Sequence, residues 1–428
     1  MVVVCFFLLP SLLPAAGNIN FGNLKIIPKI EGQALYDDNI YMKNGNDTPT
    51  DRTNKKVSDL IYHVKPGLLL NYDLPERGSA RLGWNGDWAF YNTESSNNWK
   101  NNFFNVGLDY MAPAGLILSI NDEFRLKEDP FGGPNQYALG RVTKRWDNDL
   151  KAKAGVAWGN NTFRTLFLYN LYRQQYVSNF DFTQNYTNSE YGVSAEARFL
   201  PRTWGFVRYL YGVRNFDSFY GAQMDGVFFA GIPDDRKGDS KYHQANLGVS
   251  WDPGAKLSGE VSFGYMWKRY DNAFDAFGRT RDNRDTWVAA TNIDFEATAT
   301  TVLSLNIART VRDIGSDSRI YFDDSAVGLN LRQTILTKFI AKAGVIMGFN
   351  EYNAAQALPP GASALDTVRF NAAEKRSDRN YIADLGLDYN IRDWLTFGVG
   401  YRYNRKTSNY EVFEYMDNQY MATLRLIY

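Results

Sequence analysis

The chain has 428 residues, in which 47 Lys and Arg balance 47 Asp and Glu. This balance gives no basis for nucleic-acid binding, and a mean hydropathy of −0.41 excludes a bundle of membrane helices. Aromatic residues nevertheless make up 15% of the chain, which a membrane β-barrel explains, because only alternate strand positions face lipid and aromatic residues gather at both interfaces.

The first segment of the chain is an apolar run over residues 2–13, too short to span a bilayer as a helix. Small residues follow at positions 15–17, which is typical of a secretory signal peptide. We therefore expect a signal peptide over residues 1–17 and a barrel domain over residues 18–428. The run lacks a preceding basic residue, which fits a start upstream of Met1. The single cysteine, Cys5, lies in this leader, so we expect no disulfide and no thiolate metal site.

From Leu24 onward, segments of roughly 10–16 residues alternate apolar and polar side chains, which is the period of a strand with two different faces. The pattern is clear in residues 60–73, 79–91, 256–268 and 393–405. We count about 18 such segments, an even number as single-chain bacterial barrels require. The count depends on how residues 135–160 are divided.

The connections between these segments alternate between short turns and long polar stretches. The longest stretches cover residues 38–57, 217–240, 271–284 and 351–377. This asymmetry matches the periplasmic turns and extracellular loops of an outer-membrane barrel. The sequence thus predicts an all-β, transmembrane, antiparallel up-and-down barrel in the bacterial outer membrane. A soluble sandwich or solenoid is disfavoured, because soluble strands are shorter and no repeat of solenoid period is present.

Tryptophan positions predict two interfacial belts, because the indole ring is amphipathic. Four tryptophans lie beside short turns and five lie toward long loops. These are Trp158, Trp204, Trp251 and Trp394, and then Trp88, Trp99, Trp146, Trp267 and Trp287.

The last nine residues form an alternating segment that ends on an aromatic side chain. Leu424, Leu426 and Tyr428 share one face of it. A terminal aromatic residue on a final strand resembles the signal that the barrel-assembly machinery reads, so we expect these residues to act in assembly.

Basic residues occur repeatedly on the polar faces of the predicted strands. If the apolar faces meet lipid, these residues line the lumen, together with fewer acidic ones, and basic linings favour anions. The alternative is that the charges pair across neighbouring strands and only keep the lumen wet. The predicted lining residues are Lys29, Lys65, Arg81, Arg125, Lys153, Arg164, Arg198, Arg208, Lys256, Arg332, Lys342 and Arg402.

Residues suited to catalysis are scarce in this chain. The only histidines, His63 and His243, lie in no recognisable catalytic arrangement, so we expect no enzyme, no cofactor and no His- or Cys-based metal site. Acidic doublets occur at residues 37–38, 234–235 and 323–324. Calcium could bind such loops, but no EF-hand spacing follows them, and solvated loop carboxylates are the commoner explanation.

The N-terminal third of the chain resembles the family described as Putative beta-barrel porin 2. The resemblance rests on residues 26–41 with the sequence YDDNI, on residues 58–74 with the sequence VKPG, and on the aromatic strand over residues 82–91. The matching residues are Tyr36, Asp37, Asp38, Asn39, Asp59 and Pro66. In this interpretation Tyr36 anchors the outer interface, residues 37–39 turn the chain into the first external loop, and Asp59 begins the return strand.

The resemblance implies a role in polysaccharide export, because several relatives are encoded with exopolysaccharide or capsule secretion systems. We therefore expect a passive outer-membrane conduit for an extracellular, anionic polysaccharide. A general diffusion porin and a plugged structural or adhesive barrel remain the alternatives. The expected partners are outer-membrane lipid and lipopolysaccharide, the barrel-assembly machinery and periplasmic polysaccharide-export proteins, but no nucleic acid.

Overall fold

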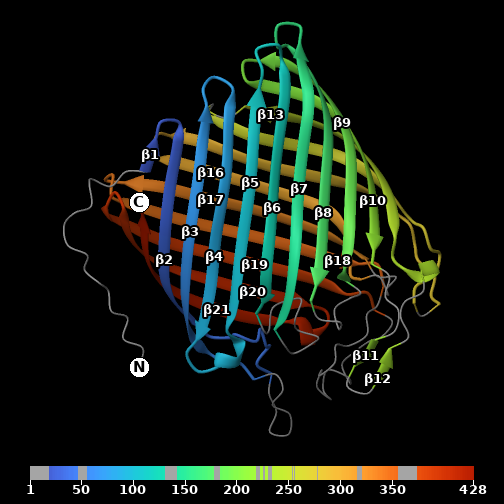
Figure 1. The fold of residues 1–428 in the computed structure, drawn as a ribbon. Coiled ribbons are helices and arrows are strands. Elements are labelled where there is room, and N and C mark those ends of the chain that lie inside the picture. The colour runs from blue at the N-terminus through green and yellow to red at the C-terminus, as the bar shows by residue number, and fades with distance from the viewer. Residues whose placement is uncertain are drawn as a thin grey trace.

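The fold is that of a closed antiparallel barrel, seen in a computed structural model of the chain (Figure 1). The structure describes residues 19–46, 55–130, 142–177, 184–217, 222–224, 227–229, 234–252, 254, 256–276, 278–315, 321–354 and 374–428. The predicted signal peptide lies wholly outside this range, as do parts of the long loops. The described part contains no helix that is long and apolar enough to cross a bilayer.

Eighteen long strands form the barrel wall in the described part of the chain. They are β2 (Leu24–Asp37), β3 (Asp59–Leu74), β4 (Gly78–Tyr91), β5 (Trp99–Met111), β6 (Leu116–Asp129), β7 (Thr143–Trp158), β8 (Phe163–Tyr176), β9 (Tyr186–Leu200), β10 (Thr203–Phe216), β13 (Ser240–Trp251), β14 (Leu257–Tyr270), β15 (Arg284–Thr298), β16 (Thr301–Asp313), β17 (Tyr321–Ile335), β18 (Phe339–Tyr352), β19 (Ser377–Arg392), β20 (Leu395–Ser408) and β21 (Tyr415–Ile427). This confirms the predicted fold class and strand number.

Short elements accompany the wall. The strand β1 (Ile19–Phe21) pairs with the start of β2, and β11 (Ala222–Met224) forms a separate hairpin with β12 (Val227–Phe229). Three 3₁₀ turns, η1 (Ser95–Asn97), η3 (Asp234–Arg236) and η4 (Glu411–Phe413), lie in the long connections.

Each long strand pairs antiparallel with its neighbours in the chain, and the wall closes where β2 meets β21. The closing ladder runs from Lys29 opposite Ile427 to Asp37 opposite Gln419. Figure 1 shows the tight turns at one end of the barrel and the longer connections at the other. We call these the short-turn end and the long-loop end.

The wall has one apolar and one polar face, as the alternation predicts. Large apolar side chains on the outer face remain well exposed, with Leu247 at 67%, Val207 at 60% and Leu385 at 60%. Their neighbours along each strand point inward and are mostly polar, so the barrel encloses a polar interior.

Tight turns connect the strands at the short-turn end, and one of them depends on a glycine. Gly78 opens β4 with φ at +143°, and a Cβ atom at this position would lie 1.8 Å from the carbonyl oxygen of Asp109. Only a residue without a side chain allows this approach of the two strands.

Two of the predicted belt tryptophans do not belong to a belt. Trp204 is 1% exposed and points inward, where its Nε1 donates to Asp252 at 3.0 Å. Trp99 packs inside the barrel, edge-on against His63 at 5.5 Å. The sequence placed both tryptophans correctly near the ends of their strands. Both fall, however, on the alternate strand positions that point inward, so the belt prediction was wrong for them.

Apolar residues also fill parts of the interior toward the long-loop end. One cluster contains Leu35, Ile40, Ile61, Ala89 and Tyr91, on β2 to β4 and the first long loop. A second cluster on β13 to β17 contains Tyr242, Met266, Val288, Val311 and Tyr321. These clusters narrow the interior at that end.

Adjacent residues on β18 test which face meets lipid. Val345 points outward and is 45% exposed, whereas Ile346 points inward with a similar exposure of 38% and lines a hollow of about 460 Å³. We expect Val345→Arg to lower the free energy of unfolding by ~2–4 kcal/mol in a bilayer, because a lipid-facing cation near the midplane is costly. Urea titration of the protein folded in lipid vesicles measures this change.

Ile346→Arg is the matched control, since it adds the same side chain to the wet face. We expect it to change the free energy of unfolding by less than about 1 kcal/mol, because the lumen tolerates charge. Equal destabilisation by the two substitutions would contradict the assignment of the faces.

Candidate functional site

The polar interior is identified by ion pairs that join strands far apart in the sheet. Arg208 on β10 reaches Glu260 on β14 at 2.9 Å, across the intervening β13. Arg214 on β10 reaches Asp313 on β16 at 2.6 Å, across three strands. Only the concave face of a closed sheet brings such side chains together, so this face is the lumen side.

Seven of the twelve predicted lining residues form ion pairs. The pairs are Lys65 with Glu31, Arg81 with Asp109, Arg125 with Glu123, Asp147 and Asp149, Arg164 with Asp252, Arg208 with Glu260, Lys342 with Asp388, and Arg402 with Asp384. For these residues the structure has the cross-strand pairing that was the alternative to a free basic lining.

The other five basic residues have no carboxylate partner among the described residues. Arg198 donates to the carbonyl oxygen of Asn160 at 3.3 Å. Lys256 lies in the turn just before β14 rather than within the strand. All five lie in a short turn or within five residues of their strand's short-turn end: Lys29, Lys153, Arg198, Lys256 and Arg332. We call them the unpaired basic group.

Unpaired acidic residues are fewer in the same region. Glu196, Asp294 and Glu296 lie within four residues of the short-turn end and form no ion pair with a Lys or Arg in the described chain. Five basic against three acidic groups leaves two positive charges in excess. The turns and the adjoining strand end add four more basic and two more acidic residues that form no ion pair in the described chain, namely Arg77, Arg202, Lys338 and Arg392 with Glu76 and Asp393.

Several charges at the long-loop end are instead buried and paired. Lys268 and Asp313 meet on the inner wall, and Tyr270 donates to the same carboxylate at 2.5 Å. At the start of β19, Asp378 is fully buried between Arg376 at 2.5 Å and Lys406 of β20 at 3.0 Å. These charges are therefore neutralised within the protein.

The described start of the first long connection packs against the long-loop end of the barrel. The Asn39 side chain is 1% exposed and donates to the carbonyl oxygens of Lys43 and Met416 at 2.8 and 2.9 Å. The hydroxyl of Tyr41 donates to Glu94 at 3.1 Å, and burial raises the pKa of this phenol. Asp59 accepts the backbone N–H groups of Thr93 and Glu94, so it fixes the next connection as well as opening β3.

The remaining residues of the family motif and of the C-terminal segment lie along the closing strands. Tyr36 is 44% exposed on the outer face and contacts Tyr420 on β21, at 6.3 Å between ring centroids. Pro66 stands opposite Ile30 on β2. Leu424 and Leu426 stand opposite Gly32 and Ile30, and the N–H of Tyr428 donates to the carbonyl oxygen of Pro28 at 3.0 Å. Their role in assembly stays a prediction.

The structure brings together two groups that sequence reasoning missed. His63 Nδ1 lies 2.7 Å from Asp87 Oδ1, on the next strand; alternation places both on the inner face, but the strand register was needed to see the contact. Asp417 on β21 lies beside Asp37 and Asp38 of the first strand and loop. No local signal could reveal this second group, because closure of the barrel creates it.

Comparison with known proteins places the chain in one family. Its sequence matches the family described as Putative beta-barrel porin 2 over residues 14–428. No curated protein matches the chain.

Among solved structures, the chain is similar to the outer-membrane protein OpdK of Pseudomonas aeruginosa, with 10% identity, a TM-score of 0.43, and coverage of 94% of this chain and 99% of OpdK. It is also similar to the siderophore receptor PirA of the same species, with 9% identity, a TM-score of 0.40, and coverage of 94% and 80%. OmpT, an outer-membrane protein of Vibrio cholerae, gives 10% identity, a TM-score of 0.34, and coverage of 96% and 100%.

The family match spans nearly the whole chain, and the described strands close into the barrel that such a family requires. The chain belongs to the Putative beta-barrel porin 2 family and is a porin-like β-barrel protein of the bacterial outer membrane.

Proposed function

We propose that this barrel is a passive conduit that conducts anions and exports an anionic polysaccharide across the outer membrane. The observation that supports this proposal is the unpaired basic group at the short-turn end, together with the excess of basic residues in the turns. In outer-membrane barrels the short turns face the periplasm. An exported polymer would therefore meet this positive region first.

The physical argument rests on the difference between paired and unpaired charges. A pair such as Arg208 with Glu260 gives little net field beyond its own dipole, whereas an unpaired cation at a narrow mouth raises the local concentration of anions. Ion pairs neutralise seven of the predicted lining residues, so the preference of the pore for anions depends on the remaining five. The effect should weaken as salt screens it.

The interior is wet enough to pass a polar solute from the short-turn end to its middle region. The side chains of Arg81 and Arg402 remain 45% and 47% exposed inside the wall although both are paired. A dry core would not tolerate so many partly exposed charges. Family membership supports a pore, while the polysaccharide as substrate rests on the resemblance and on the position of the unpaired basic group.

Ion selectivity in planar bilayers tests the role of the unpaired basic group. We expect the wild-type channel to prefer chloride over potassium under a salt gradient. The double variant Lys153→Gln and Arg332→Gln should reduce this preference at least twofold, because it removes two cations that form no ion pair in the described chain. The reversal potential measures the ratio directly.

Lys144→Gln is the control for this measurement, since Lys144 lies at the long-loop end, is 64% exposed and pairs with Glu128. We expect it to leave the selectivity unchanged. Cation preference in the wild type, or an equal effect of Lys144→Gln, would argue against an anion-selective mouth.

Deletion of the gene tests export. We expect the deletion strain to lose surface polysaccharide and to accumulate it in the periplasm, and we expect the wild-type gene to restore export. The double variant should restore it only in part, although it reaches the membrane at normal levels. Quantifying extracellular and periplasmic uronic acid gives the comparison.

Unchanged surface polysaccharide in the deletion strain would reject the export role. Liposome swelling in small neutral sugars then separates the alternatives: rapid swelling indicates a general diffusion porin, and no swelling indicates a plugged structural or adhesive barrel.

A further inference from the structure

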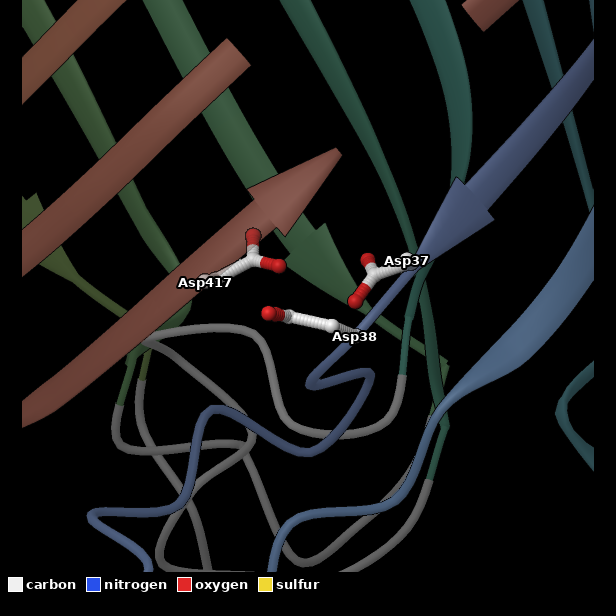
Figure 2. A group of neighbouring side chains, drawn as sticks. All are labelled: Asp37, Asp38 and Asp417. Atoms are coloured by element: carbon white, nitrogen blue, oxygen red, sulfur yellow. The ribbon is translucent and has the colours of Figure 1, made fainter. Parts of the chain in front are cut away.

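Three carboxylates from opposite ends of the chain meet at the long-loop end of the closing seam. Asp37 ends β2, Asp38 follows it, and Asp417 lies near the start of β21. One oxygen from each lies within 4.8 Å of the others. Figure 2 shows the three side chains turned toward a common space between the two strands.

The Asp417 carboxylate is buried and lacks a partner on the side that faces this space. The residue is 1% exposed. Its Oδ2 accepts hydrogen bonds from Asn404 and Gln419, each at 2.9 Å. No N–H or hydroxyl group of the described residues donates to its Oδ1, and the Asp37 carboxyl lies within hydrogen-bond reach of Asp417. Figure 2 shows the carboxylate directed toward Asp37 and Asp38.

Other deeply buried aspartates show how this protein usually neutralises such a group. Four aspartates are at most 1% exposed, and three of them have cationic partners. Asp147 has Arg145 at 3.4 Å, Asp275 has Arg279 at 2.7 Å, and Asp378 has Lys406 at 3.0 Å. Asp417 is the exception, and neither Asp37 nor Asp38 has a Lys or Arg partner in the described chain. A buried charge must be paired, neutralised or bound to a metal ion.

Amide groups hold the outer carboxylates in fixed orientations. Asp37 accepts the N–H of Asn39 at 2.7 Å and the side-chain amide of Gln419 at 3.0 Å. Asp38 accepts the backbone and side-chain N–H groups of Asn418 at 2.8 and 2.7 Å. Such donors orient the two carboxylates, as outer-shell partners do around bound metal ions.

We propose that Asp37, Asp38 and Asp417 bind a calcium ion that links the first and last strands of the barrel at its extracellular rim. Calcium binds oxygen ligands at about 2.3–2.6 Å, so two ligands on opposite sides of the ion lie up to about 5 Å apart, which suits the observed spacing. Magnesium, at about 2.0–2.1 Å, would need a tighter cluster. Water completes the coordination.

A shared proton is the competing way to neutralise the cluster. One proton between Asp417 and Asp37 would remove a single negative charge and leave the other two carboxylates facing each other. A divalent cation neutralises two charges and also satisfies the free Oδ1 of Asp417. The two explanations predict different responses to calcium and to acid.

Calorimetric titration with CaCl₂ tests the proposal. The full-length protein is refolded from urea into detergent, free of lipopolysaccharide (which binds divalent cations itself), and treated with EDTA. We expect one saturable binding event with a Kd on the order of 10⁻⁴ to 10⁻³ M, the range of extracellular calcium modules. Calcium should also raise the thermal unfolding midpoint of the folded barrel.

Asp417→Asn removes the ligand oxygen while keeping the shape and neutrality of a protonated acid, so the barrel should fold. We expect it to weaken calcium binding at least tenfold and to abolish the thermal shift, and Asp38→Asn should weaken binding through a more accessible ligand. Asp235→Asn is the control, because Asp235 belongs to an exposed acidic doublet on η3. It should behave as the wild type does.

Three results would overturn the proposal. They are the absence of saturable calcium binding to the wild type, unchanged binding by Asp417→Asn, or stabilisation of the wild type by mild acid with no response to calcium. The last result would indicate the shared proton.

Discussion

The closing ladder between β2 and β21 is the interaction on which the rest of the structure depends. In hydrocarbon no water can satisfy an exposed N–H or C=O group, and each unsatisfied group costs several kcal/mol. An open sheet of eighteen strands would present two such edges to lipid. The backbone pairs from Lys29 with Ile427 to Asp37 with Gln419 remove both edges. The first and last strands therefore have to pair before one face of the wall is committed to lipid and the other to the lumen.

Closure also explains why charge is distributed unevenly along the interior. Curvature brings Arg214 and Asp313 together across three strands, and Asp313 is buried among its partners there. Charges there are neutralised by partners such as Lys268. Short turns cannot cover the opposite end, so basic residues such as Lys153 and Arg332 stay hydrated and need no partner. The long-range field of the pore thus comes from the end that is least covered.

The strands, their number and the short turns could be predicted from sequence, because a two-residue period and the turn residues are local properties. The prediction of lining residues was less complete. Alternation placed Arg208 on the inner face correctly, but only register and curvature show that Glu260 neutralises it. Trp204 and Trp99 show the same limit for the prediction of aromatic belts. Nearness to a turn predicts how far along the strand a residue lies, whereas the alternation of side chains decides whether it faces lipid or the lumen.

The carboxylate group at the seam shows why local sequence could not distinguish one acidic doublet from another. Asp323 in one doublet pairs with Arg284 and Arg309, and Asp234 in another pairs with Lys237. The doublet at residues 37–38 instead acquires a third acid from β21, about 380 residues away. Closure satisfies the strand edges but places like charges together at the rim. Because the ladder fixes both strands, the three carboxylates are held close together, and the calcium ion proposed above would balance their charge at that point.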